Sequence, residues 1–484
     1  MAHRNAAAPA RGTVGQVCRR GRERWAMTRE LPAFLRLGRD AVDAIARRSP
    51  ARLTLIVFSG VIIAVTGLLS LPMSTTSGER APFVDALFTA TSAVCVTGLV
   101  TVDTATYWSS FGQVVIMVAI MVGGLGVMTL ASILGLAVSR RIGLTQRLLA
   151  AAETKTTRLG EVGSLIRAVI ITSLSLELTL ALVLVPKFLV LGHSFGSALW
   201  QGSFMAVSIF NNAGIVILPG GLNQFVGDWW MSLPIIIGTF VGALGFPVIL
   251  SVAHSWRRPR RWTLHAKLTL TTSAALFVLG AILVGAFEWD NPVTFGGLPL
   301  ADRVLASMLA GMTTRSSGFS TVNVSDMSEA TWFMQDALMF IGGGSASTGG
   351  GIKVTTFAVL ILAIVAEARG DRDIEAYGRR LDSSTLRLAI GVSFIGATFV
   401  GIAALALLVL TDLQLDVILF EVISAFATCG LSTGITPDLP NSAQYVLIAL
   451  MFAGRTGTMT LAAALALRNR RRVIRLPEER PIIG

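Results

Sequence analysis

Long apolar runs separated by short polar stretches dominate the pattern along this chain. A helix needs about 20 predominantly apolar residues to cross a bilayer. Eight segments are long enough: roughly 53–71, 111–138, 165–191, 231–253, 268–287, 333–366, 386–410 and 443–467. The pattern therefore predicts an all-α polytopic membrane protein with eight transmembrane helices.

A shorter, partly apolar stretch lies between the two members of each successive pair of predicted spans. These stretches cover about 82–99, 196–214, 302–318 and 416–432. They are too short to cross the bilayer and are rich in Gly, Ser, Thr and Asn, which suits re-entrant loops. The sequence thus predicts four re-entrant pore loops, one for each pair of spans.

The order span, pore loop, span occurs four times, and the four loops end in similar strings. Their glycines, Gly98, Gly214, Gly318 and Gly430, are 116, 104 and 112 residues apart. Such a regular repeat predicts four pseudo-symmetric units around one central pore. The predicted division is a basic cytoplasmic N-terminal segment, four repeats and a cytoplasmic tail, at 1–50, 51–140, 141–256, 257–367, 368–475 and 476–484.

The first half of each re-entrant stretch is expected to form a short helix. Asp85, Asp302 and Asp416 lie near the start of three of these helices, where an acidic side chain favours the positive end of the helix dipole. The extended backbone that follows ends in glycine, which permits positive φ and close approach, so successive carbonyls can point at one centre. A single glycine in a span usually serves helix packing. Four glycines at the equivalent position of four repeats instead favour a cation filter, in which carbonyls replace hydration oxygens.

The distribution of charge gives the predicted spans an orientation. Of 40 Lys and Arg residues, 34 lie in five segments, at 1–52, 139–167, 257–267, 367–387 and from 468 onward. With eight spans all five segments share one face, which the positive-inside rule makes cytoplasmic, with both termini inside. The net charge of +12 is therefore a topology signal and not a sign of nucleic-acid binding. The six exceptions are Arg80, Lys187, Arg303, Arg315, Lys353 and Arg455.

The N-terminal segment carries a further prediction. Residues 30–48 are expected to form a basic amphipathic helix with Phe34, Leu35, Val42 and Ile45 near one face. Two interpretations stay open for it: a helix on the membrane surface, or a site for a specific partner.

The composition excludes several other classes of protein. Only 14% of the residues are charged, whereas a soluble domain has about 25%. Cys18, Cys95 and Cys429 are too scattered for a disulfide framework or a zinc site, and the four histidines form no metal-ligand pair. An intramembrane enzyme would need a metal motif, paired aspartates or a Ser/His arrangement, and the sequence has none. We therefore expect no enzyme and no cofactor, and a purely structural scaffold would leave the four glycine loops unexplained.

At these loops the sequence resembles the Ktr/Trk/HKT superfamily of potassium transporters. It is most similar to the ion-conducting membrane subunit of bacterial Ktr systems, over roughly residues 50–484. The strings that carry the resemblance are TSAVCVTGL at 91–99, FNNAG at 210–214, RSSGF at 315–319 and GLSTG at 430–434, with LPEE at 476–479. Each string alone is weak, but together they are highly specific.

The resemblance implies potassium uptake across the plasma (inner) membrane through a carbonyl-lined selectivity filter. In this family a glycine at all four filter positions goes with potassium, and a serine at the first goes with sodium in some plant relatives, so Gly98 favours potassium. A sodium-conducting or sodium/potassium-permeable member is the alternative. The implied filter residues, with potassium as the substrate ion, are Cys95, Val96, Thr97, Gly98, Asn211, Asn212, Ala213, Gly214, Ser316, Ser317, Gly318, Ala427, Thr428, Cys429 and Gly430.

The resemblance also implies partners. These are a second copy of the chain in a homodimer, membrane lipids, and a cytosolic ring of nucleotide-binding regulatory subunits. No partner nucleic acid is expected. Whether sodium acts as an additional activating ion is left open.

A glycine-rich stretch interrupts the sixth predicted span at 342–351. Its six glycines exclude a stable helix interior, because each costs about 1 kcal/mol relative to alanine. A phosphate-binding loop is also excluded, because Lys353 does not follow Gly349 directly. In the resembling family this stretch is a flexible intramembrane gate below the filter. The implied gate residues are Gly342, Gly343, Gly344, Ser345, Thr348, Gly349, Gly350, Gly351, Lys353 and Arg455.

Lys353 and Arg455 are charges within apolar spans, which cost about 2.5–3.5 kcal/mol on insertion and usually serve function. Two interpretations of Arg455 stay open. It faces the pore near the gate, where it anchors the loop or forms a barrier to cations, or it pairs structurally with Glu177 or a helix C-terminus. Glu177 is the only acid deep in its span, so it needs a partner that the sequence does not name.

Overall fold

The computed structural model describes residues 50–126 and 162–457, and this part of the chain is almost entirely helical. The mainly helical architecture predicted from the sequence is therefore confirmed. The predicted helix at 30–48, the tail at 476–484, most of the basic segment 139–167 and the ends of the second and eighth predicted spans lie outside the described residues.

Four groups of helices follow one another along the described chain, each with a short helix in second place. The first group is α3 (Pro50–Leu69), α4 (Phe83–Cys95) and α5 (Ser110–Gly124). The second is α8 (Val162–Val190), α9 (Phe195–Phe210), α10 (Trp229–Leu244) and α11 (Phe246–Ser255). The third is α12 (Leu264–Glu288), α13 (Leu300–Thr313), α14 (Glu329–Phe340) and α15 (Val354–Arg369). The fourth is α16 (Ser383–Leu410), α17 (Leu415–Ala427) and α18 (Asn441–Phe452), which continues as a π-helical turn, Ala453–Gly457.

The remaining elements are short. Single 3₁₀ turns lie at Pro72–Ser74, Asn223–Phe225, Pro259–Arg261, Val324–Asp326 and Thr436–Asp438. A two-stranded antiparallel hairpin, β1 (Glu375–Ala376) and β2 (Arg379–Arg380), joins α15 to α16. Its two-residue turn, Tyr377 and Gly378, has positive φ at both positions, as a tight hairpin turn of this length requires.

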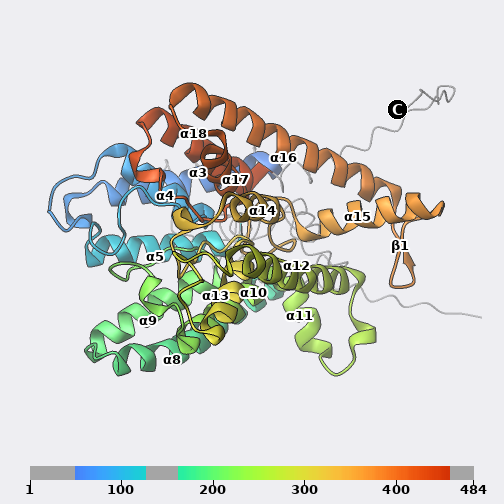
Figure 1. Ribbon diagram of the computed structural model, residues 1–484, viewed down its shortest axis with the longest axis horizontal. Coiled ribbons are helices and arrows are strands. Elements are labelled where there is room, and N and C mark those ends of the chain that lie inside the picture. Colours follow the sequence, from blue (N-terminus) through green and yellow to red (C-terminus); the bar gives the residue numbers. More distant parts are fainter. Residues whose placement is uncertain (1–49, 127–161, 458–484) are drawn as a thin grey trace, which may run out of the picture.

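The four groups close into a ring through contacts between neighbouring groups. Helix α5 packs on α9, α10 on α13, α14 on α17, and α18 of the last group packs on α4 of the first. Figure 1 shows this closure, with the blue first group and the red last group side by side. The short helices lie inside the ring and are buried along most of their length, so they form the centre of the core.

The capping residues of the helices follow from the sequence. A Ser, Thr or Asp side chain accepts a hydrogen bond from a first-turn N–H at α5, α9, α10, α12, α14 and α16. Asp85, Asp302 and Asp416 lie in the first turns of α4, α13 and α17, as expected from the sequence. The negative ends of these three short helices therefore point toward the loops that follow them.

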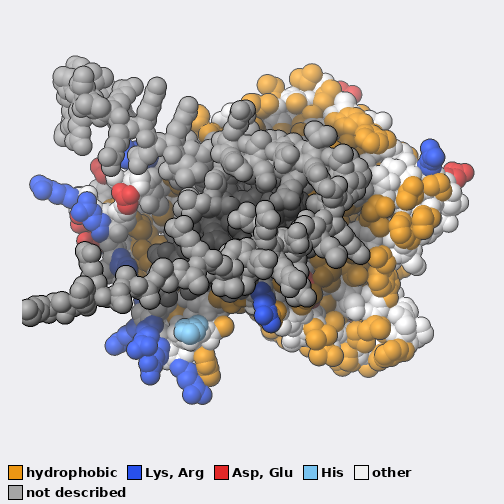
Figure 2. All heavy atoms as spheres, turned by 180° about the vertical axis from the view of Figure 1, so that it is seen from behind, with side chains coloured by type: hydrophobic (Ala, Val, Ile, Leu, Met, Phe, Trp, Pro, Cys, Tyr) orange, Lys and Arg blue, Asp and Glu red, His pale blue; other side chains and the backbone are white. Residues whose placement is uncertain are grey.

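Three described helices are long and apolar enough to cross a membrane by length and composition: Ile166–Val190 of α8, α12 and α16. Helices α10 and α11 together would make a fourth. The outward side chains of these helices are apolar, as shown by Phe394 and Val409, which are 73% and 79% exposed. Figure 2 shows such side chains over much of the visible flank, whereas Lys and Arg gather at one end of the molecule.

The prediction of one continuous helix over 231–253 is wrong. The chain bends by 100° between α10 and α11. Gly245, at the bend, has a φ of 90°, and a Cβ there would lie 2.5 Å from the carbonyl oxygen of Ser345. Backbone bonds to the glycine-rich stretch hold the bend, since Phe246 N–H donates to Ala346 and Gly344 N–H donates to Ala243. The apolar run hid this bend because the residues on both sides of it are hydrophobic.

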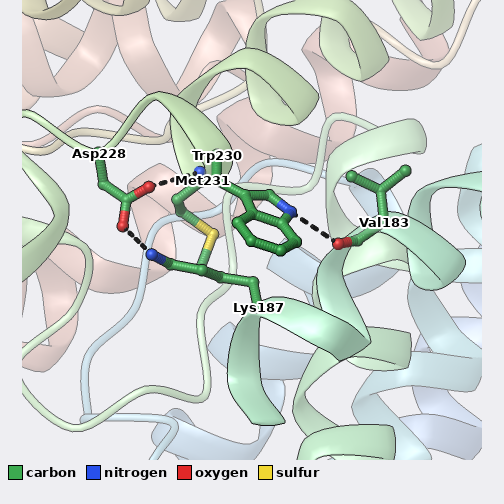
Figure 3. A network of polar contacts seen from close by, with 5 residues as sticks. All are labelled: Val183, Lys187, Asp228, Trp230 and Met231. Carbon is green, nitrogen blue, oxygen red and sulfur yellow. Dashed lines mark hydrogen bonds and ion pairs between the residues drawn. The ribbon is translucent and has the colours of Figure 1, made fainter. Parts of the chain in front are cut away.

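Lys187, one of the basic residues outside the five basic segments, ties the end of α8 to the start of α10 (Figure 3). Its ammonium group forms an ion pair with Asp228, and its Nζ lies 5.8 Å from the centroid of the Trp230 ring. The indole Nε1 of Trp230 donates to the Val183 carbonyl at 3.0 Å, and Asp228 also accepts from Met231 N–H. This network fixes the second group at the end opposite the bend.

Glu288 holds the end of α12 against the start of α14. Its carboxylate accepts from Asn291 Nδ2 and Thr294 Oγ1 at 2.7 Å, and from both the backbone N–H and the hydroxyl of Ser328 at 2.9 Å. Thr331 Oγ1 is a fifth donor. Five donors around one buried carboxylate leave no room for a ligand, so the cluster is a structural clamp.

Glu288→Gln is expected to lower the thermal stability of the protein. The amide of glutamine has one acceptor oxygen, and its NH₂ group would face hydrogen-bond donors, of which the backbone N–H cannot become an acceptor. Hydrogen bonds to a charged group contribute about 1.5–3 kcal/mol. Thermal unfolding in detergent should show a midpoint several degrees lower. Glu329→Gln, which removes an exposed carboxylate beside the clamp, is the control. Equal midpoints for the two variants would contradict the role of the clamp.

Candidate functional site

The four predicted filter glycines meet in a closed ring at the centre of the molecule. A Cβ at Gly98 would lie 2.6 Å from the Ala213 carbonyl oxygen, one at Gly214 would lie 2.8 Å from that of Ser317, and one at Gly318 would lie 2.7 Å from that of Cys429. A Cβ at Gly430 would overlap the carbonyl oxygen of Thr97, which closes the ring. At every corner a glycine faces the carbonyl that precedes the glycine of the next loop, so a side chain at any corner would collide with its neighbour.

The backbone conformation repeats in all four loops. Each glycine has positive φ, at 101°, 67°, 68° and 92° in chain order. The residue two positions earlier is also left-handed in every loop, although none of the four is glycine: Val96, Asn212, Ser316 and Thr428, with φ between 47° and 61°. Left-handed φ at non-glycine residues costs energy and clusters at functional sites. Because this conformation occurs at the equivalent position of all four loops, the loops share one specific backbone geometry.

The N–H groups of three loops are bonded to the helix behind them. Thr97, Ala213 and Cys429 each donate to the carbonyl of a serine five residues earlier at 2.8 Å. The hydroxyls of two of these serines, Ser92 and Ser424, also accept from the glycine N–H at 3.0 Å. Because the N–H groups are satisfied behind the loops, the carbonyls on the opposite side remain available for a ligand at the axis.

The third loop is held differently. Met312 stands where the other loops have that serine, and Ser317 N–H donates to the Thr313 carbonyl at 3.3 Å. Arg315, fully buried, reaches out of this loop to α12, where it donates to the Ser273 carbonyl at 2.8 Å and to the Ser273 hydroxyl at 3.2 Å. Ser316 Oγ donates to the Ala427 carbonyl at 2.8 Å and joins the third loop to the fourth. The third loop is therefore tied by side chains to a neighbouring helix and to the neighbouring loop.

The structure brings the four predicted loops together in this ring, while Cys95 and Ala427 are the last residues of α4 and α17, and Asn211 turns its side chain to Glu177. Gly214, Gly318 and Gly430 are partly exposed, and the others are buried. The ring is thus accessible to solvent at three of its four glycines and closed behind them. The described residues contain no group of three or more His, Cys, Asp or Glu that could hold a metal.

The glycine-rich stretch lies directly against this ring. It joins α14 to α15, and its base is closed by bonds from Gly342 N–H to Ile352 and from Val354 N–H to Gly343. A Cβ at Gly350 would overlap the Thr428 hydroxyl, and one at Gly349 would lie 3.1 Å from Ser316 Cβ. No larger residue fits between the stretch and the ring at Gly350.

Arg455 and Lys353 both bond to carbonyls of this stretch. Arg455 Nη1 donates to the Thr348 carbonyl, and its Nη2 donates to the Gly123 carbonyl at the end of α5 at 2.8 Å. Lys353 Nζ donates to the Gly349 carbonyl at 2.7 Å. The two cations therefore hold the stretch from two sides.

Of the two structural partners considered for Arg455, the pairing with Glu177 is wrong, whereas a contact with a helix C-terminus is present, because Nη2 bonds to Gly123 in the last turn of α5. Glu177, buried in α8, instead accepts from Asn211 Nδ2 at 2.8 Å and from Ser173 Oγ at 3.1 Å. The partner of Glu177 is thus a residue of the second filter loop. The sequence could not name it, because the two residues are 34 positions apart in the chain and meet only in the fold.

Two sets of residues next to the ring were not found from the sequence. Gly123, Gly242 and Gly454 leave room for the carbonyls that end three short helices, those of Val94, Phe210 and Phe426. Each of these glycines follows a filter glycine by a similar number of residues, so the repeat in the sequence could have identified them.

The second missed feature is Glu421, a fully buried carboxyl in α17 that accepts from Thr436 behind the fourth loop. It is the only acid between Asp416 and Asp438. The reasoning applied to Glu177 would have found it.

Comparisons with known proteins agree with this geometry. The sequence pattern of the family described as TrkH, cation transport protein, matches residues 40–471. Ktr system potassium uptake protein B of Bacillus subtilis is 36% identical over 93% of this chain and 100% of its own length. Potassium/sodium uptake protein NtpJ of Enterococcus hirae is 33% identical over 90% of this chain and 98% of its own length.

The crystal structure of the potassium transporter TrkH from Vibrio parahaemolyticus has a similar fold. The TM-score is 0.63 at 18% identity, and the match covers 86% of this chain and 85% of that chain. The resemblance inferred from the four loops is therefore confirmed, as is the prediction of a transporter in place of an enzyme. This chain belongs to the TrkH family of cation transport proteins.

Proposed function

We propose that this chain takes up potassium across the plasma membrane through the ring of four glycine loops. The observation that carries the proposal is the repeated backbone geometry, in which the N–H groups of three loops are satisfied behind the ring and carbonyls are left on its axis. Such carbonyls replace the hydration oxygens of a cation without any charged side chain. The filter residues are those implied by the resemblance, and potassium is the substrate.

The choice of potassium is supported by relatives of similar length. Two potassium uptake proteins of Bacillus subtilis, B and D of the Ktr system, are each 36% identical to this chain. The potassium/sodium uptake protein of Enterococcus hirae supports the alternative, a pore that also admits sodium. The four glycines fit the first possibility, because no side chain occupies the ring.

Flux into vesicles should separate these possibilities. We expect the purified protein in vesicles to admit potassium, or rubidium as its tracer, well above sodium, and to restore growth of potassium-uptake-deficient bacteria at low potassium. Equal sodium and potassium flux would favour the alternative. If neither ion moves with the regulatory partner present, the transport proposal is wrong.

The segment 342–351 is proposed to be the gate. It occupies the space beside the ring and contains no helix, so its bonds to Arg455, to Lys353 and to the backbone around the bend can break without unfolding a helix. Its six glycines allow the large φ/ψ changes that such a movement needs.

The topology and partners complete the proposal. The ring of four groups supports eight spans and four pore loops, and the basic segments support cytoplasmic termini. A homodimer and a cytosolic nucleotide-binding regulatory ring are proposed from the resemblance to Ktr systems. The regulatory ring would bind the basic cytoplasmic face of this chain. Crosslinking of the purified protein tests the dimer.

A further inference from the structure

The segment that follows the bend at Gly245 leaves the direction of the spans. Helix α11 turns by 100° from α10, so if α10 crosses the membrane, α11 runs close to the membrane plane. Figure 1 shows it leaving the helix bundle on the side where α15 and the β hairpin lie. Its inner face, with Phe246 and Val248 buried, packs on the bundle, while His254 and Trp256 at its end are exposed. This is the placement of a helix at a membrane–water interface.

A cavity of about 540 Å³ opens at the end of α11. Its lining includes Arg257, Arg258 and Arg261 together with His254, Trp256 and two serines. Figure 2 shows this end of the molecule, where Lys and Arg side chains gather beside a histidine. Three guanidinium groups around one cavity favour an anion that accepts several hydrogen bonds, above all a phosphate.

These arginines have no acidic partner among the described residues. None of them forms an ion pair with a residue in the described ranges 50–126 and 162–457. The sequence places no Asp or Glu between Asp228 and Glu288. Like charges held this close repel one another, and an anion bound among them relieves that repulsion.

The turn that carries the arginines is fixed in place. The guanidinium carbon of Arg257 lies 4.8 Å from the centroid of the Trp256 ring, and Trp262 Nε1 donates to the Ser255 carbonyl at 3.2 Å. Lys267 Nζ donates to the Arg260 carbonyl at 3.4 Å. Trp256 itself is 65% exposed, and tryptophan with an exposed ring is typical of the headgroup level of a bilayer.

We propose that this pocket binds the phosphate headgroup of an anionic phospholipid. The shared chemistry is a phosphate group, which a soluble phosphate could also supply. The interfacial direction of α11 and the exposed indole favour the lipid, whose acyl chains would lie along the apolar flank. The site is separate from the ring of glycine loops, and its binding can be measured without any transport.

Lipid titration of the purified full-length protein by native mass spectrometry tests the proposal. We expect phosphatidylglycerol to be retained over phosphatidylcholine with the same acyl chains. The triple variant Arg257→Gln, Arg258→Gln, Arg261→Gln should lose about fivefold in affinity for each charge removed, or about 100-fold in all. These arginines are exposed, so the variant should unfold at the same temperature as the unmodified protein.

A second triple variant controls for the loss of charge alone. Arg369→Gln, Arg372→Gln, Arg379→Gln removes three exposed arginines that do not line the cavity, and it should retain phosphatidylglycerol as the unmodified protein does. Equal retention by the two triple variants would overturn the proposal.

Two further outcomes would also overturn it. Inorganic phosphate that binds through the three arginines, with no preference for phosphatidylglycerol, would identify a soluble ligand. A pocket variant that keeps the lipid but no longer binds the cytosolic regulatory protein would identify a protein contact.

Discussion

Gly98→Ser is expected to remove the preference for potassium, lowering the ratio of potassium to sodium flux by at least about tenfold. The new Cβ would lie 2.6 Å from the Ala213 carbonyl oxygen, which is closer than van der Waals contact allows. Because this carbonyl belongs to the neighbouring loop, the substitution displaces oxygens of two loops at once. The measurement is tracer flux in vesicles, with potassium and sodium tested separately.

Gly434→Ser provides the matched control for backbone strain. Gly434 has a φ of 93°, close to the 101° of Gly98, but nothing lies within 4 Å of a Cβ built there. A serine at either position pays the cost of a left-handed residue, about 1–2 kcal/mol, and only the one at Gly98 also collides with the ring. If both variants lose selectivity equally, general destabilisation is the cause and the carbonyl ring is not the selective element.

Arg455→Gln is expected to raise potassium flux about tenfold or more in the absence of any activating partner. The arginine spans from the Thr348 carbonyl in the proposed gate to the Gly123 carbonyl at the end of α5. Hydrogen bonds from a charged donor contribute about 1.5–3 kcal/mol, and 1.4 kcal/mol corresponds to a tenfold change in an equilibrium. Loss of these bonds should therefore shift the gate toward its displaced state.

Hydrogen exchange distinguishes an anchor from a simple charge barrier. If Arg455 anchors the gate, amides in 342–351 should exchange faster in Arg455→Gln, and Arg455→Lys, whose single ammonium cannot reproduce the planar fork, should be intermediate. If Arg455 acts only as a barrier to cations, the lysine variant should conduct like the unmodified protein and exchange should stay unchanged. Reduced flux in the glutamine variant would contradict both roles.

The central ring was predictable because its sequence signal is local and repeated. Each loop places a glycine at the same distance from a short apolar helix, and a positive φ needs glycine wherever a neighbouring carbonyl comes close. The left-handed conformation of Val96 and Thr428 was not predictable. These side chains have no local preference for it, and the packing of four loops around one axis imposes it.

The partners of the buried charges could not be predicted either. Arg455 and Glu177 stood out because charges are costly within apolar spans. That cost does not indicate which way each side chain points or which residue it contacts. Glu177 bonds to Asn211, and Arg455 bonds to backbone carbonyls that any sequence would supply. The bend at Gly245 was missed for a related reason, since hydropathy measures how apolar a segment is and not where it points.

The cyclic closure of the ring also constrains the order of folding. The last corner joins Gly430 to Thr97, which lie near opposite ends of the described chain. Contacts between such distant residues form late, because a long loop must first be closed. During synthesis the first three groups can therefore insert and pack, but the ion site cannot exist until the fourth emerges. A chain that stops before Gly430 would be an inserted protein without a filter.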